Sequence, residues 1–392
     1  MNKLFFASTA LVLAGAPFAA QAQDWTVKGN IAGSVGTTEN VLASAANETS
    51  DTVYGLSGKV VLGTESDGGS FSAFASADLT HYADVDDENA DDYAFGANGA
   101  IKFDGGSVFA GASHALNTED RRKITARRDT RNPTEFTVDS FDAGFRTRLG
   151  AVAFSARVDY VTSDYEDGRH RITNALIDQD SRDRGTWTET FRITGSPDAD
   201  VSVFGEVAFT QVDYDLAPPA AIHNRDSEGY TASVGATFDI TDQITGEISA
   251  GWSGRSFDSP TFDDVSDLVI DGSLTITPSS ETTLVLSASR GFEESTVVLS
   301  PITVSTAVGF TVTHDITPDF QVAAYVSQSW DDHENRDRQD TTGGAGVSVA
   351  FKVAPNAEIT GAYDFSTQDS EGIHGVPGYD DGRLTVGFKI GF

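Results

Sequence analysis

The 392-residue chain contains no cysteine, and it has few basic residues. Without cysteine it has no disulfides and no thiolate metal sites, so its stability must come from backbone pairing and burial. Lys and Arg number 26 against 59 Asp and Glu, a net charge of −33. Because nucleic acids and anionic membrane surfaces are bound by clustered Lys and Arg, this balance argues against both, and no nucleic-acid partner is expected.

Long apolar runs are also missing, except at the start of the chain. Residues 1–22 combine an early Lys3, an apolar run from Leu4 to Ala20 and the small-residue sequence Ala20-Gln21-Ala22, which is the pattern of a secretory signal peptide. We expect cleavage after Ala22 and one domain over residues 23–392. Since no later segment could cross a bilayer as a helix, a membrane form of this protein would have to be a β-barrel.

Motifs for catalysis are absent as well. The chain has no Gly-x-Ser-x-Gly or His-Glu-x-x-His sequence, and its seven histidines are scattered. We therefore expect no enzyme, no catalytic residue, no cofactor and no metal site. Acidic clusters at 84–92, 258–267 and 331–334 lack the spacing of a calcium loop, so solvated loop charge is the favoured interpretation. Divalent bridging to lipid is the alternative.

The sequence is rich instead in strictly alternating segments. In the last eleven residues, Gly382 to Phe392, every second side chain is apolar, which predicts a strand with one apolar and one polar face. A final strand that ends on an aromatic residue resembles the closing strand of an outer-membrane β-barrel. That resemblance implies that Phe392 belongs to the signal read by the barrel assembly machinery.

The same alternation recurs along the chain and predicts about eighteen strands, with sixteen as the rival number. The expected strands are 25–36, 52–63, 69–82, 91–103, 106–114, 135–149, 151–162, 186–195, 200–214, 228–240, 243–256, 266–277, 282–290, 301–314, 319–331, 340–352, 356–366 and 379–392.

Short turns and long polar loops take turns between these strands. Such a rim pattern predicts an all-β fold, a single transmembrane antiparallel up-and-down β-barrel with short periplasmic turns and long extracellular loops. Tyr and Trp at the strand ends fit interfacial girdles. The alternative is a soluble sandwich, which at this length would need two domains, and no linker divides the chain.

Positive charge is concentrated in one region. Between Arg121 and Arg192 lie 14 of the 26 basic residues. Four of them alternate against apolar rows and should point into the lumen as pore-lining groups: Arg146, Arg148, Arg157 and Arg192. The loop from Asn117 to Asn132 supplies six candidate constriction cations: Arg121, Arg122, Lys123, Arg127, Arg128 and Arg131. Either this loop narrows the pore and sets selectivity, or it only pairs with neighbouring carboxylates and lipid phosphates.

From about Ile240 to Phe392 the chain resembles the putative β-barrel porin 2 family of Gram-negative outer membranes. Glu281 to Arg290, Glu293 to Thr296 and the closing hairpin carry the resemblance. It implies a barrel used for permeation or exopolysaccharide export, with no agreed functional residues. We expect a porin-like channel for polar solutes or exopolysaccharide. The alternative is a non-conducting barrel that acts as a surface anchor or a partner of a polysaccharide export complex. Expected partners are outer-membrane lipids, lipopolysaccharide, the barrel assembly machinery and polysaccharide export proteins.

Overall fold

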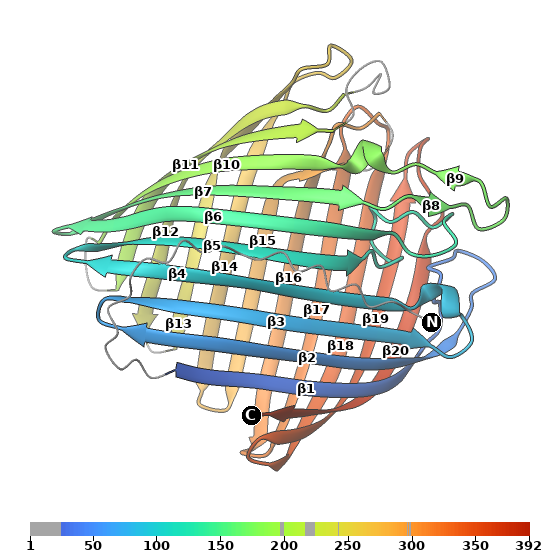
Figure 1. Cartoon of the computed structure of the whole chain (residues 1–392), viewed down its shortest axis with the longest axis horizontal. Coiled ribbons are helices and arrows are strands. Elements are labelled where there is room, and N and C mark those ends of the chain that lie inside the picture. Colours follow the sequence, from blue (N-terminus) through green and yellow to red (C-terminus); the bar gives the residue numbers. More distant parts are fainter. Residues whose placement is uncertain (1–24, 197–199, 216–223, 242, 296, 298) are drawn as a thin grey trace.

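The computed structural model forms a closed antiparallel β-barrel (Figure 1). It describes residues 25–196, 200–215, 224–241, 243–295, 297 and 299–392. The predicted signal peptide and its cleavage site therefore lie outside the described residues. Within the described part, no helix is long and apolar enough to cross a membrane.

Eighteen strands form the barrel wall, which confirms the larger of the two predicted numbers. They are β1 (Trp25–Thr38), β2 (Asp51–Ser66), β3 (Gly69–Tyr82), β4 (Ala90–Phe103), β5 (Gly106–Thr118), β6 (Glu135–Leu149), β7 (Val152–Tyr165), β10 (Arg184–Gly195), β11 (Val201–Tyr214), β12 (Ser227–Thr241), β13 (Ile244–Phe257), β14 (Val265–Ser279), β15 (Thr282–Glu294), β16 (Ile302–Thr317), β17 (Phe320–His333), β18 (Gln339–Ala354), β19 (Ala357–Glu371) and β20 (Tyr379–Gly391).

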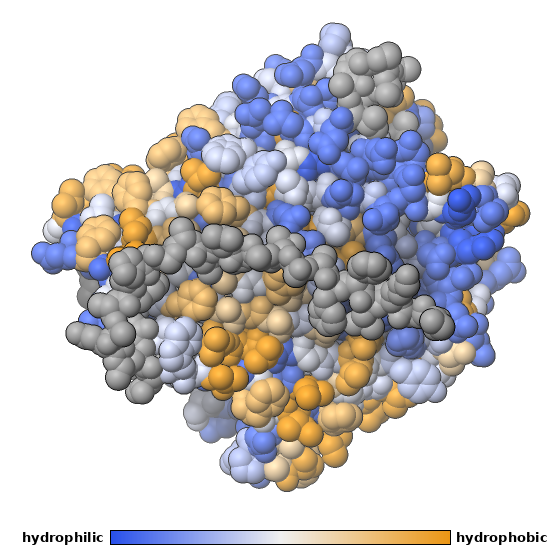
Figure 2. Space-filling model, in the orientation of Figure 1, coloured by the Kyte–Doolittle hydropathy of each residue, from blue (hydrophilic) through white to orange (hydrophobic). Residues whose placement is uncertain are grey.

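Alternation along each strand separates an apolar outer face from a polar inner face. On β20, Leu384, Val386, Phe388 and Ile390 are all exposed on the outside, and the residues between them face the lumen. Side chains on an outer wall can stay apolar only where lipid replaces water as the solvent. Figure 2 shows apolar side chains gathered over the wall, while hydrophilic ones cover the end of the barrel that carries β8 and β9.

The barrel is sealed between its first and last strands, as the closing-strand pattern predicts. β1 pairs antiparallel with β20 from Asn30 opposite Gly391 to Thr38 opposite Arg383. Gly29 and Phe392 extend this seam with two reciprocal backbone hydrogen bonds of 2.9 Å each. The Phe392 ring also covers Gly29, where a Cβ atom would come within 2.5 Å of it. Closure leaves no sheet edge exposed.

The two rims differ as predicted. At the short-turn rim the strands are joined by tight links, for example 104–105 and 280–281, and both ends of the described chain lie there. At the long-loop rim the connections include 39–50, 119–134, 166–183 and 372–378. Loop 166–183 carries a small hairpin of β8 (Gly168–Arg169) and β9 (Leu176–Ile177) and the 3₁₀ turn η2 (Asp180–Arg182). A second 3₁₀ turn, η1 (Asp86–Glu88), lies in loop 83–89.

The aromatic girdle holds for most of the residues expected in it, but not for all. Trp25, Tyr54 and Trp252 are exposed on the outer wall. Tyr214 is only 8% exposed, and its hydroxyl donates a 2.7 Å hydrogen bond to Glu294. Tyr214 ends β11, so it was among the strand-end tyrosines predicted for the girdle, but it lies on the inner face at the long-loop rim and that prediction was wrong for it.

Candidate functional site

The four predicted wall arginines lie on the inner row of their strands. Arg146 stands over the Phe109 ring at 5.4 Å. Arg157 is 2.7 Å from Asp159 on its own strand and 3.9 Å from Asp142 on β6. Arg148 occupies the same row of β6 as Arg146. The inner wall of this side is therefore cationic but partly compensated.

Arg192 makes the strongest of these wall contacts. Its two terminal nitrogens each donate a 3.0 Å hydrogen bond to one Glu247 oxygen, and its guanidinium lies 3.4 Å from the centre of the Phe204 ring. Glu206 is a second carboxylate at 3.7 Å. A bidentate pair stacked on an aromatic face holds the guanidinium in one geometry. The arginine is thus paired along the wall with carboxylates of β11 and β13.

Loop 119–134 joins β5 to β6. It reaches as far as β20, which is separated from β5 in the barrel by strands β1 to β4. Its Arg122 lies 2.5 Å from Asp120 and 3.8 Å from Asp381, which follows Tyr379 on β20. The Tyr379 hydroxyl in turn donates a 2.8 Å hydrogen bond to the carbonyl of Arg122. Burial alone would lower the pKa of Arg122, but its bonds to Asp120 and the charge of Asp381 raise it. The guanidinium therefore stays charged at this anchor.

Next to Arg122, the same loop is also held by a buried ion pair of Arg121. Arg121 and Glu88 are each 3% exposed, and they form two hydrogen bonds of 2.8 and 2.9 Å. Arg121 also donates to the carbonyls of Arg127 and Arg131, so it fixes the course of the loop itself. A second arginine, Arg171 of loop 166–183, reaches Glu88 at 3.2 Å. We call these three residues the Glu88 latch.

Loop 166–183 provides a further attachment. Arg182 is buried and lies 2.7 Å from Glu119. Thr130 forms a β-bridge with His170, and the backbone N–H of Arg131 donates to the carbonyl of Arg169 at 2.6 Å. The basic loop is therefore fixed at both ends and along its length.

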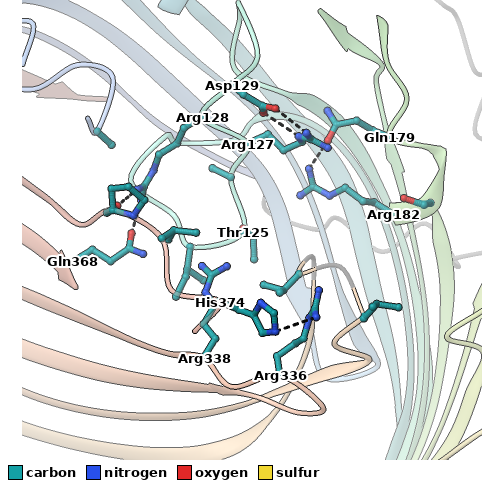
Figure 3. Close-up of a pocket in the computed structure, with 18 of the residues that line it drawn as sticks. Thr125, Arg127, Arg128, Asp129, Gln179, Arg182, Arg336, Arg338, Gln368 and His374 are labelled. Carbon is teal, nitrogen blue, oxygen red and sulfur yellow. Dashed lines mark hydrogen bonds and ion pairs between the residues drawn. The ribbon is translucent and has the colours of Figure 1, made fainter. Parts of the chain in front are cut away.

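These loops enclose a cavity of about 970 Å³ at the long-loop rim (Figure 3). In the figure, Arg128 lies beside Gln368 on one side, Arg182 lies beside Gln179 on another, and Arg336 contacts His374 below. Arginines from four loops line it, together with a smaller number of carboxylates: Arg127, Arg128, Arg182, Arg225, Arg336, Arg338, Asp129 and Asp178.

The six loop cations predicted from sequence thus have different surroundings. Arg121 is buried in the Glu88 latch, Arg122 anchors the loop, and Arg127 pairs with Asp129 at 2.8 Å. Arg128 faces the cavity, whereas Lys123 and Arg131 are exposed. Four further arginines of the cavity were not predicted from the sequence: Arg182, Arg225, Arg336 and Arg338. Two of these, Arg336 and Arg338, directly follow the acidic cluster at 331–334, and that segment was interpreted as solvated negative charge.

The described carboxylates include one group whose oxygens could share a cation. Asp167, Asp178 and Asp180 each place an oxygen within 4.8 Å of the others, and all three are exposed. None of the acidic clusters noted in the sequence contains them, because the β8–β9 hairpin brings them together. Exposed carboxylates often gather in this way without an ion, so we assign no role to them.

Comparison with known proteins places this architecture. The model of the putative beta-barrel porin 2 family matches residues 16–392. The chain belongs to that family. The match spans nearly the whole chain and so extends well beyond the C-terminal segment that carries the resemblance. The chain therefore has a porin-like outer-membrane channel fold, and in such barrels the long-loop rim is the extracellular mouth.

Solved structures with a similar fold are distant in sequence. OpdK from Pseudomonas aeruginosa is 10% identical, with 94% of this chain and 99% of that chain covered and a TM-score of 0.46. OccAB3 from Acinetobacter baumannii is 12% identical, covers 94% and 100%, and has a TM-score of 0.47. A BenF-like porin from Pseudomonas fluorescens Pf-5 is 8% identical, covers 94% and 98%, and has a TM-score of 0.49. No curated protein matches the sequence.

One carboxylate at the mouth should titrate near neutral pH. Burial, together with the charges of Asp164, Asp180 and Asp215, raises the pKa of Asp183 to about 6, although the Tyr165 N–H donates to it. A raised carboxyl pKa means that the folded loop holds this proton more tightly than the unfolded chain does. Stability from this group therefore increases as pH falls from 7 through 6 and decreases as pH rises.

We expect hydrogen exchange of loop 166–183 to slow between pH 7 and pH 5, after correction for the intrinsic exchange rate. Asp183→Asn should remove this pH dependence, whereas Asp178→Asn on the same loop should preserve it. An unchanged profile in the Asp183 variant would contradict the assignment.

Proposed function

We propose that this outer-membrane barrel is a passive channel for polar solutes. The observation that carries the proposal is the loop-lined cavity inside the extracellular mouth, above a wall whose inner rows are polar. An antiparallel barrel of eighteen strands is wide enough to enclose an aqueous lumen. Loop 119–134 would then limit solute size, and the arginines around it would set the charge preference.

Exopolysaccharide is a second candidate solute. A non-conducting barrel that serves as a surface anchor or as a partner of an export complex is the alternative function. The many fixed contacts of loop 119–134 are the observation that favours this alternative, because they would suit a permanently narrowed mouth. Partners under either function would be lipopolysaccharide, the barrel assembly machinery and polysaccharide export proteins. A hydrolytic activity is not part of the proposal, and the absence of enzymatic function stays a prediction.

Planar-bilayer conductance separates the two functions. We expect stepwise openings with a linear current–voltage relation from the refolded protein. Replacing residues 120–133 with a short Gly-Ser linker should raise the single-channel conductance, since it removes the loop from the mouth and leaves β5 and β6 whole. Heat-modifiable gel mobility would verify that both barrels are folded. No openings from either folded protein would contradict the channel and favour the anchor.

A further inference from the structure

The cations around the mouth cavity are not all compensated. Arg127, Arg182 and Arg338 each pair with a carboxylate, namely Asp129, Glu119 and Asp340. Two other arginines that line the same cavity, Arg128 and Arg225, have only neutral acceptors among the described residues.

Arg128 is held in place from the β20 side. Its guanidinium donates to the side-chain oxygen of Gln368 and, at 3.3 Å, to the carbonyl of Pro377, and it lies 4.7 Å from the Tyr379 ring centre. Burial lowers the pKa of Arg128, and the charge of Arg338 adds to this effect, although Tyr379 and Asp340 act in the opposite direction. The guanidinium is thus oriented by dipoles and an aromatic face, and no carboxylate of the described residues forms a direct bond with it.

Arg225 is held in the same manner from the β11 side. It donates to the carbonyl of Ser295 and, at 2.8 Å, to the carbonyl of Ser181, and it stacks 4.3 Å from the Tyr214 ring centre. Both arginines therefore use a tyrosine face and carbonyl or amide oxygens, which fix orientation without neutralising charge. Their supports lie on opposite arcs of the rim, β19–β20 for Arg128 and β11–β12 for Arg225.

The rest of the cavity lining is partly apolar. Ile124, Phe262, Leu299 and Val376 come from four different loops and contribute to its wall. Phe262 is 6% exposed and packs edge-on against Phe257, so it is a fixed element. Apolar side chains combined with a few oriented polar groups are typical of a site for a small organic ligand.

We propose that the mouth cavity is a binding site for small organic carboxylates with an apolar body, contacted by Arg128 and Arg225. This inference rests on the proposed channel function and names its substrate class. The surrounding surface is strongly acidic, so carboxylates would be repelled from the barrel unless a local cationic site attracted them. A guanidinium can bind a carboxylate through two parallel hydrogen bonds, while the apolar wall accepts the body of the ligand.

The test uses cyclohexanecarboxylate, with cyclohexanecarboxamide as the neutral analogue and inorganic phosphate as an anion without an apolar body. Binding to the folded full-length barrel is measured by calorimetry in detergent, and passage is measured in bilayers by current block and reversal potential. The variant is Arg128→Gln/Arg225→Gln. Its matched control, Lys102→Gln/Lys352→Gln, removes two cations near the short-turn rim. Arg128→Lys/Arg225→Lys preserves the charge.

We expect the carboxylate to bind wild type about tenfold more tightly than either the amide or phosphate. The Gln variant should lose this preference, while the control and the Lys variant should still favour the carboxylate over the amide. Equal binding by the Gln variant and wild type would overturn the inference, as would equal binding of phosphate and carboxylate. If binding follows the expected pattern but wild type never conducts, the channel function fails and the site stands. If wild type conducts without any carboxylate preference, only the site fails.

Discussion

Removal of Phe392 should prevent most of the protein from assembling in the outer membrane while export across the inner membrane continues. The residue contributes two backbone hydrogen bonds to Gly29 at the barrel seam, and its ring covers that glycine. Its side chain is 65% exposed, so packing within the barrel accounts for only a small part of its value. The larger loss is expected at the step where the assembly machinery recognises the terminal strand.

Phe351→Ala is the matched control for this deletion. Phe351 is also aromatic, is 50% exposed on the outer wall and lies near the short-turn rim, but it is far from the chain end. The heat-modifiable fraction in outer-membrane preparations is the measurement. We expect it to decrease severalfold for the deletion and to change little for the control. Equal assembly of the deleted and intact chains would contradict a role for the terminus.

Glu88→Gln should release loop 119–134 from the mouth. The substitution preserves shape but leaves the buried Arg121 charge without its carboxylate, and Arg171 loses the same partner. Breaking a buried pair on one side costs about 3–5 kcal/mol, because a desolvated charge is left uncompensated. Such a cost is comparable with the free energy that holds a loop in place. The loop should therefore become accessible to trypsin at its arginines. The channel current should become larger and noisier.

Glu65→Gln provides the comparison for the latch variant. Glu65 pairs with Lys102 at 2.8 Å, but both side chains are well exposed, and an exposed pair contributes little to stability. Trypsin digestion and bilayer recordings of this variant should match those of wild type. If the Glu88 and Glu65 variants behave alike, the latch does not hold the loop.

The wall of the barrel could be predicted from sequence because lipid imposes a period of two on every strand. The expected ranges are close to the observed strands, and most errors lie at the long-loop ends. The strand expected at 356–366 continues to Glu371, and that expected at 282–290 continues to Glu294. There the apolar alternation stops while the hydrogen-bond ladder continues, since the wall has left the membrane and both faces meet water.

The mouth could be predicted only in part. The concentration of arginine in one loop is visible in the sequence, but their partners are not. Glu88, Glu119 and Gln368 come from distant segments, and only the closed barrel brings them to Arg121, Arg182 and Arg128. Alternation assigns a side chain to the inner or outer face. It contains no information about contacts between loops, which depend on the curvature of the whole barrel.

The anchoring of loop 119–134 also has a mechanical consequence. The loop is attached to Glu88 through Arg121, and to the β19–β20 arc through Arg122 and Arg128, so it bridges two parts of the ring. A bare ring of strands flattens easily under lateral pressure from a bilayer, because bending needs no hydrogen bond to break. A loop fixed to two parts of the ring opposes flattening along the line that joins them. The segment that narrows the mouth would then also keep it round.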